Sequence, residues 1–275
     1  MQALANDFLK NLDYKGYAFN TKKSYSKDIK RFLSFCELKK LEEPKQVLPN
    51  EIVEFSKMLQ SGYFSEGQTL SNKSINLALT SVKSFFTYLV NTGQAQYCPV
   101  NSYHYLKVQA PPIKIVDEEQ YQKLISLCDN NLIKFSLILM FRAGLRRSEL
   151  NYLPVDNLSL SSRPHIILDK TKNRKPRVCP IFATKEELEF LSDFQDKSFF
   201  LFTGEMHSKL SYAFEKFKTQ GEAVSPHELR RGFATQRASE GIAIQLIARM
   251  LGHESILTTM RYILITNSDL LNLVG

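Results

Sequence analysis

Two segments near the C-terminus contain side-chain types that could act together on a phosphodiester. The first contains His227 and Arg230, and the second contains His253 and Tyr262. A tyrosine titrates near ~10, so ionising its hydroxyl at neutral pH costs roughly 4 kcal/mol. A nearby base and a fixed positive charge on the phosphate would offset that cost. The set therefore predicts attack on a phosphodiester by a tyrosine hydroxyl.

The first segment has the sequence signature of a helix start. Ser225 suits the N-cap position, Pro226 the first helical position, and Glu228 lies three residues after the cap, where it can reach back. Because His227 and Arg230 are three residues apart, we expect them on one face of this helix.

The second segment reads as a helix end followed by a turn and a new helix. Gly252 suits a left-handed cap after Leu251, which leaves His253 in the turn. The next helix is expected to begin near Ser255 and to carry Tyr262.

At these residues the sequence resembles the tyrosine recombinase (phage integrase) family. That family shows a His-x-x-Arg box, a Leu-Gly-His box and a tyrosine nine residues after the second histidine. Here the boxes are His227–Arg230 and Leu251–His253, and Tyr262 follows His253 at 262 − 253 = 9 positions.

A third box supports the resemblance. Residues 143–150 match the family's Gly-Leu-Arg-x-Ser-Glu-Leu pattern, which implies that Arg146 is the first catalytic arginine, with Arg147 at the variable position and Glu149 at the acidic one. The preceding residues 131–143 are nearly all apolar, so we expect a buried core helix there.

A hairpin is predicted from two short strands. They are His165–Leu168 and Arg177–Phe182, separated by a charged turn with Asn and Pro. Five cations crowd this hairpin beside the acid Asp169: Lys170, Lys172, Arg174, Lys175 and Arg177.

The resemblance implies a catalytic lysine on the hairpin, eight residues before a proline. Since Pro180 gives 180 − 172 = 8, Lys172 is the expected residue, and Lys170 is the alternative because hairpin length varies. For Arg174 and Lys175 we favour simple phosphate contacts.

The resemblance thus implies one catalytic set: Arg146, Lys172, His227, Arg230, His253 and Tyr262. The two arginines would neutralise the phosphate, Tyr262 would form a 3′-phosphotyrosyl link, and Lys172 would protonate the departing 5′ oxygen. His227 would serve as general acid and base, and His253 would hydrogen-bond the phosphate. Neither metal, cofactor nor ATP is expected. Arg231 departs from the family, where a histidine is common at this position.

Composition agrees with a nucleic-acid partner. The 275 residues carry a net charge of +8, with 43% hydrophobic and 23% charged residues. Such a charge favours an anionic partner, and phosphate-dominated binding must weaken steeply with salt. We find no membrane span, secretory signal, disulfide framework or zinc pattern, so a cytosolic protein with reduced, mostly buried cysteines is expected.

The chain is expected to form two domains. Residues 1–108 look all-helical, with helices capped by Thr21, following Asn50 and running from about Ser71 to Asn91, and with a basic face on the first of these. They resemble the family's N-terminal core-binding (SAM-like) domain.

Residues 109–115 contain two prolines and read as a linker, and residues 116–275 as the catalytic domain. Within it, helices are expected to begin at Asp117 and Thr184 and to span Ser208–Gly221 and Ile242–Leu251. The fold class is mainly α with a small β-sheet or hairpin.

The expected function is site-specific DNA recombination by a homo- or hetero-tetramer on two duplexes with inverted-repeat core sites. A type IB topoisomerase-like swivelase and a non-catalytic DNA-binding protein are the alternatives. Chromosome-dimer resolution, mobile-element integration and DNA inversion stay open as biological roles. The apolar tail after Tyr262 is expected either to pack on a neighbouring protomer or to fold back onto its own domain.

Overall fold

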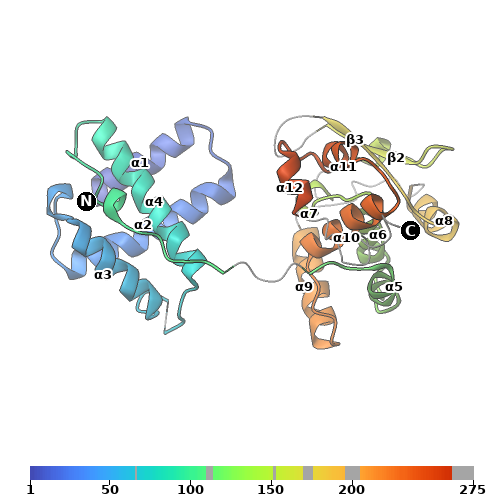
Figure 1. The fold of residues 1–275 in the computed structure, drawn as a ribbon, viewed down its shortest axis with the longest axis horizontal. Helices are drawn as coiled ribbons and strands as arrows, with labels where there is room; N and C mark the ends of the chain where they lie inside the picture. The colour runs from blue at the N-terminus through green and yellow to red at the C-terminus, as the bar shows by residue number, and fades with distance from the viewer. Residues whose placement is uncertain (66, 110–113, 151–152, 170–175, 196–204, 262–275) are drawn as a thin grey trace, which may run out of the picture. The chain divides into compact units, whose positions relative to one another are not determined.

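The computed structural model describes residues 1–65, 67–109, 114–150, 153–169, 176–195 and 205–261. It divides into two compact units, Met1–Pro111 and Pro112–Gly275, and Figure 1 labels the helices and strands of each. In the described part, no helix is both long and apolar enough to cross a membrane. The thiols of Cys36, Cys98 and Cys179 are buried and that of Cys128 is half-buried, and all four cysteines are unbridged.

The N-terminal unit is helical. Its helices are α1 (Gln2–Tyr14), α2 (Phe19–Leu38), α3 (Pro49–Gln60) and α4 (Asn72–Asn91), with short 3-10 turns at Pro44–Gln46 and Pro99–Ser102. Phenylalanines from α2, α3 and α4 fill its core, among them Phe32, Phe35, Phe55, Phe85 and Phe86, all fully buried. Burial of such large apolar groups supplies most of the stability of a small helical unit.

The predicted start of α4 is confirmed, and that of α2 is wrong. The Ser71 hydroxyl accepts the Ser74 N–H at 3.3 Å, as an N-cap should. The helix α2 instead begins at Phe19, because the Ala18 carbonyl already accepts the Lys22 N–H at 3.0 Å. Thr21 therefore lies inside the first turn and caps nothing.

The C-terminal unit packs helices around a small antiparallel sheet. Its described elements are α5 (Glu118–Ser126), α6 (Asn131–Arg142), α7 (Arg147–Leu150), a 3-10 turn (Val155–Asn157), β1 (Leu158–Ser159), β2 (His165–Leu168), β3 (Arg177–Pro180), α8 (Lys185–Gln195), α9 (Glu205–Thr219), α10 (Pro226–Ser239), α11 (Ile244–Leu251) and α12 (Ile256–Met260). The sheet order is β1-β2-β3. This confirms a mainly α fold with a small sheet.

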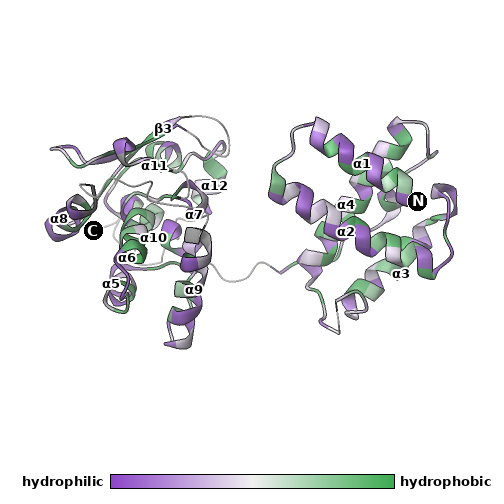
Figure 2. Cartoon of the chain, turned by 180° about the vertical axis from the view of Figure 1, so that it is seen from behind, coloured by the Kyte–Doolittle hydropathy of each residue, from purple (hydrophilic) through white to green (hydrophobic). Residues whose placement is uncertain are grey.

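The core of this unit is α6. Phe135 and the run from Leu137 to Phe141 are buried on it, which confirms the predicted core helix, and its ribbon is mostly green in Figure 2. The helix α10 packs against α6 at Gly232, where an added Cβ would lie 2.7 Å from the Phe141 ring. This close approach brings the N-terminal half of α10 beside the turn that follows α6.

The predicted helix starts at Asp117 and Thr184 are confirmed, because the side chains of these residues cap α5 and α8. Asp117 accepts the Gln120 N–H at 2.8 Å, and Thr184 and Glu187 exchange hydrogen bonds of 3.3 and 2.8 Å. Other boundaries differ from expectation: β3 ends at Pro180, α9 spans Glu205–Thr219 and α11 begins at Ile244. The strand β1 was not predicted, since two residues are too short for an alternation pattern.

Candidate active site

The helix α10 carries two of the expected residues, and its start forms as predicted. Ser225 and Glu228 make the reciprocal capping box, with the Glu228 carboxylate accepting the Ser225 N–H at 2.7 Å. Arg230 is 2% exposed, whereas His227, one turn earlier, is exposed. The cap thus sets where the helix presents this histidine and this arginine.

Arg230 spans two distant parts of the unit. Its guanidinium donates to the carbonyl of Gly144, after α6, and to that of Leu251, at the end of α11. Its Nη2 also lies 3.3 Å from His253 Nε2. The buried arginine therefore joins three sequence segments that were predicted to meet.

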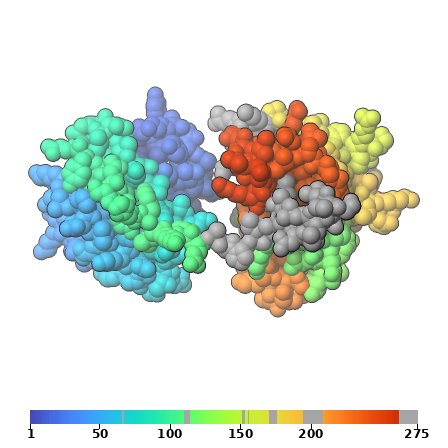
Figure 3. Space-filling view, viewed as in Figure 1, coloured from blue at the N-terminus to red at the C-terminus, as the bar shows by residue number. Residues whose placement is uncertain are grey.

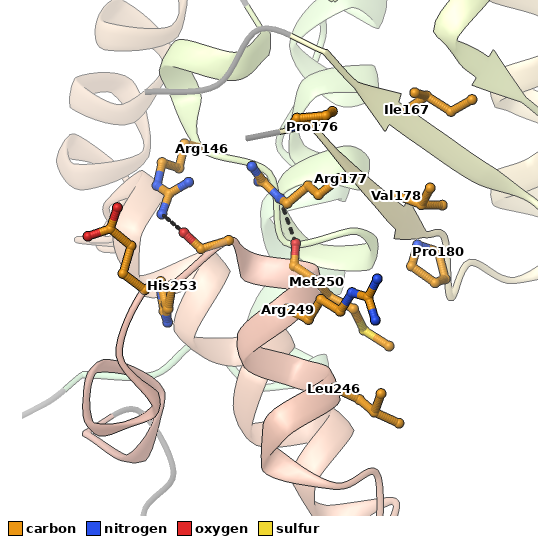
Figure 4. Close-up of a pocket in the computed structure, with 12 residues that line it drawn as sticks. Arg146, Ile167, Pro176, Arg177, Val178, Pro180, Leu246, Arg249, Met250 and His253 are labelled. Atoms are coloured by element: carbon orange, nitrogen blue, oxygen red, sulfur yellow. Dashed lines mark hydrogen bonds between the residues drawn. The ribbon is translucent and has the colours of Figure 1, made fainter. Parts of the chain in front are cut away.

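Arg146 lies on the turn between α6 and α7. Its backbone N–H and its Nη1 both donate to the Glu149 carboxylate at 2.8 Å, and its Nη2 donates to the Gly252 carbonyl at 3.2 Å. Figure 4 shows Arg146 reaching towards the turn that carries His253. Its side chain is 22% exposed, so Arg146 is partly accessible to solvent, unlike the buried Arg230.

Three consecutive carbonyls at the end of α11 accept hydrogen bonds from three different arginines. The pairs are Met250 with Arg177 at 2.8 Å, Leu251 with Arg230, and Gly252 with Arg146 at 3.2 Å. The C-terminal end of a helix carries a partial negative charge that favours cations. Gly252 ends the helix with φ 61°, as predicted, which turns the chain so that His253 follows in the site.

One carboxylate organises the arginines. Glu149 has a 3% exposed side chain, pairs with Arg146 at 2.8 Å and Arg177 at 2.7 Å, and lies 3.9 Å from Arg230. Burial alone would raise the pKa of Glu149, but the hydrogen bond and charge of Arg177, with the other arginines, hold that pKa below its usual range. Glu149 is therefore ionised and offsets part of the local positive charge.

Both histidines are surrounded by positive charge. Desolvation, followed by the charges of Arg230 and Arg146, lowers the pKa of His253 to about 4. Desolvation, followed by the charges of Arg230 and Arg231, also lowers the pKa of His227. The Nδ1 atom of His253 lies 2.7 Å from the Thr259 hydroxyl, which fixes the ring. The imidazole of His253 is thus neutral at pH 7 in the absence of a ligand.

Several expected residues lie outside the described part of the chain. They are Tyr262, Lys172 and its alternative Lys170, the hairpin cations Arg174 and Lys175, and the tail after Tyr262. The helix α12 ends at Met260, two residues before Tyr262. The structure thus brings together Arg146, His253 and Arg230, with His227 on the same helix as Arg230.

A cavity of about 690 Å³ opens beside these residues. Its lining combines charged and apolar side chains (Figure 4). The charged or polar residues are Arg146, Arg177, Arg249, His253 and Glu254, and most of the others are apolar residues of β2, β3 and α11. Figure 3 shows atoms of the C-terminal helices gathered on one face of the unit. Among the described residues, no group of three or more histidine, cysteine or acidic side chains could hold a metal ion.

Sequence reasoning missed the role of Arg177. It was counted among the hairpin cations, yet its side chain is 6% exposed and paired with Glu149. A signal was present: Arg177 and the fully buried Cys179 are two apart on β3, so they point to the same face. The Thr259 contact to His253 carried no comparable signal.

These side chains bring three arginines and a histidine together on a mainly helical fold. The chain belongs to the phage integrase family: the model of that family matches residues 114–268, and the model of the phage integrase N-terminal SAM-like domain matches residues 4–96.

Curated relatives match most of the chain. Tyrosine recombinase XerA of Pyrococcus horikoshii is 28% identical over 97% of this chain and 90% of its own length. XerA of Thermococcus kodakarensis is 30% identical over 71% of this chain and 72% of its own length. XerD of Listeria innocua is 27% identical over 97% of this chain and 95% of its own length.

Solved structures share the fold. A lambda integrase dimer bound to a COC′ core site matches with a TM-score of 0.75 at 16% identity, over 95% of this chain and 94% of that one. The Tn1549 transposon integrase in complex with transposon right end DNA matches with a TM-score of 0.72 at 18% identity, over 98% of each chain.

Proposed function

We propose that this member of the tyrosine recombinase class is a site-specific DNA recombinase that cuts and rejoins strands through a 3′-phosphotyrosyl intermediate on Tyr262. One observation carries the proposal. Arg146, Arg230 and His253 come from three separate segments. The Arg146–Gly252 hydrogen bond, the 3.9 Å ion pair of Arg230 with Glu149 and the 3.3 Å Arg230–His253 contact join them into one site.

The two arginines would bind the scissile phosphate. A guanidinium offers several N–H donors in a rigid fork that matches phosphate oxygens. Arg146, partly exposed, would contribute donors from the solvent side, and Arg230 from the buried side. Together they would neutralise the charge that builds up as phosphorus becomes five-coordinate.

The neutral state of His253 suits a hydrogen-bonding role. An arriving phosphate brings negative charge next to an imidazole whose pKa is about 4 because of desolvation and neighbouring arginines. That charge would raise the pKa of His253 and favour donation of an N–H to a phosphate oxygen. His227, exposed on α10, would exchange the tyrosine proton.

Tyr262 and Lys172 complete the proposed chemistry. The tyrosine hydroxyl would attack phosphorus and displace the 5′ oxygen, which Lys172 would protonate. The bond energy stays in the phosphotyrosine, so a 5′ hydroxyl of another strand can reverse the attack without ATP. The proposed roles require no cofactor.

The N-terminal unit is proposed to be the core-binding domain, over residues 1–108, with a linker at 109–115 and the catalytic domain at 116–275. Its helix α2 exposes Lys23, Lys27 and Lys30, which would contact DNA phosphates. The similar integrases in complex with DNA support a double-stranded DNA partner. The predicted cytosolic location remains part of this proposal.

The proposed assembly is a tetramer, homomeric or with a partner recombinase, on two duplexes with inverted-repeat core sites. A topoisomerase-like swivelase would act as a monomer, and a DNA-binding protein with a relic site would not cleave. Neither alternative is favoured, because the curated relatives are named tyrosine recombinases.

A nicked suicide substrate tests the chemistry. Once the wild-type protein cleaves, the short 5′ strand diffuses away and the covalent protein–DNA adduct accumulates. Tyr262→Phe should give no adduct, and Lys172→Ala should cleave slowly. An adduct formed by Tyr262→Phe would show that another residue is the nucleophile, and full cleavage by Lys172→Ala would move the acid to Lys170. Synapsis of two labelled duplexes separates a recombinase from a swivelase.

A further inference from the structure

Arg177 holds the arginine site together although no expected catalytic role falls on it. We propose that Arg177 is a positioning residue. Its guanidinium hydrogen-bonds the Glu149 carboxylate and a backbone carbonyl at the end of α11, so that Arg146 and Arg230 can direct N–H groups towards the scissile phosphate. This inference rests on the proposed function.

Arg177 has two anchors on different elements. Its Nε donates to the Met250 carbonyl at 2.8 Å, and its Nη2 donates to the Glu149 carboxylate at 2.7 Å. A Cβ added at Gly252 would lie 3.0 Å from its Nη1, so the guanidinium fills the space under the turn before His253. Arg177 therefore joins β3, α7 and the end of α11.

The competition for Glu149 explains why the site needs this third arginine. The Oε1 atom of Glu149 accepts from Arg146 Nη1 at 2.8 Å. The Oε2 atom accepts from Arg177 Nη2 at 2.7 Å and from the Arg146 backbone N–H at 2.8 Å, so loss of Arg177 removes its only side-chain donor; Arg230 Nη1 lies 3.9 Å away. A buried carboxylate left short of donors draws in the nearest cation. Without Arg177, Arg230 is the cation in reach, and moving it towards Glu149 takes it away from the phosphate.

The same side chain fixes the turn that carries His253. Both Arg177 and Cys179 donate to the Met250 carbonyl, at 2.8 and 3.3 Å, so the inner face of β3 is tied to the last turn of α11. His253 follows three residues after Met250. A shift of that turn would change where the imidazole meets the phosphate.

A second route of action is open to test, because Lys172 lies five residues before Arg177 in the sequence. Arg177 could act on the leaving group through the hairpin strand instead of on the phosphate. Two modified substrates separate these routes. A methylphosphonate at the scissile position removes the charge that the arginines neutralise, and a 5′-bridging sulfur leaves without needing a proton.

The experiment measures single-turnover cleavage by the full-length chain at saturating DNA, on the ordinary, methylphosphonate and 5′-sulfur nicked substrates. Arg177→Lys keeps the charge but cannot reach both anchors. We expect it to cleave the ordinary and 5′-sulfur substrates about 100-fold more slowly than wild type, as for an ångström-scale misplacement, with DNA affinity unchanged. On the methylphosphonate the loss should shrink to less than about 10-fold, because the phosphate clamp matters less there.

The outcomes separate cleanly. An equal loss on all three substrates would mean that Arg177 only supports the fold, and recovery on the 5′-sulfur substrate would mean that it acts through the leaving group; either overturns the proposal. If the lysine variant does not fold, Arg177→Gln, which keeps a neutral donor, replaces it in the same comparison.

Two control variants and the wild type distinguish failure of the positioning role from failure of the proposed function. Arg163→Lys, on the exposed turn before β2, should match wild type on every substrate. The cleavage rate of Lys172→Ala should recover only on the 5′-sulfur substrate. If it does not, the proposed role of Lys172 is refuted, but the comparison of Arg177→Lys with wild type on the three substrates still tests the positioning role. Absence of any adduct with the wild type would refute the proposed function, and the positioning role with it.

Discussion

Gly252 is the position where a single methyl group should disturb the site most directly. It has φ 61°, and an added Cβ would lie 3.0, 3.1 and 3.2 Å from three atoms of the Arg177 side chain. Gly221, in the same unit, has φ 91° but no atom within 4 Å of such a Cβ. Gly221→Ala therefore measures backbone strain alone, and Gly252→Ala measures strain plus the contact.

The expected magnitudes follow from these two contributions. A left-handed conformation costs an alanine about 1 kcal/mol. At Gly252, Arg177 must also move by a few tenths of an ångström, which weakens its charge-assisted hydrogen bonds to Met250 and Glu149 and adds about 1 kcal/mol. We expect Gly221→Ala to destabilise the C-terminal unit by about 1 kcal/mol and Gly252→Ala by about 2 kcal/mol.

Native-state hydrogen exchange is the suitable assay, because a two-unit chain has no single unfolding free energy. The slowest amides of α6 and α11 should exchange about 30-fold faster in Gly252→Ala and about 5-fold faster in Gly221→Ala. Gly252→Asn keeps the Cβ contact but tolerates the left-handed conformation, so it should fall between wild type and Gly252→Ala. Equal effects of the two alanine variants would refute the reasoning, since Arg177 would then not fill the space under the turn.

Three further predictions concern other described contacts. Arg142→Met should destabilise the C-terminal unit by about 3 kcal/mol, because the Glu187 carboxylate, 12% exposed, loses its 2.8 Å partner. Urea denaturation followed by hydrogen exchange measures this loss, and adding Glu187→Gln to the Arg142→Met variant should change the stability little further. By NMR titration the pKa of His253 should be about 4 in the free protein and higher with DNA bound. Because a histidine in the unfolded chain titrates near ~6.5 and so binds more protons, the folding stability should fall as the pH drops from about 6.5 towards 4. A stability that does not change over this range would contradict the assignment. Asn76→Ala should speed exchange of the Leu106 amide, which now donates to the Asn76 side chain at 3.0 Å; unchanged exchange would mean that this contact does not hold the segment after the 3-10 turn.

The sequence predicted well the features that depend on a few neighbouring residues. The capping box of Ser225 and Glu228 and the left-handed Gly252 are decided within one turn of helix, and both formed as expected. Thr21 shows the limit of this reasoning: a good capping residue does not cap when the helical hydrogen bonds begin earlier, here at the Ala18 carbonyl.

The meeting of distant residues was predictable only through the family motifs. Nothing in the local sequence tells that Arg230 reaches the carbonyl of Gly144, 86 residues away. Arg177 was counted only among the hairpin cations for the same reason, since its burial depends on Glu149, which lies 28 residues earlier in the chain. The fold class followed from periodicity and caps, whereas these pairings depend on the packing of the whole unit.

The row of arginine-capped carbonyls at the end of α11 has a consequence for the speed of catalysis. In water, a developing negative charge is stabilised only after solvent dipoles have rotated towards it, and that rotation adds to the barrier. Here the guanidinium groups of Arg146 and Arg230 are already held by peptide oxygens of a folded helix. A phosphate would meet dipoles whose orientation was set during folding, so the reorganisation energy of the step would be small.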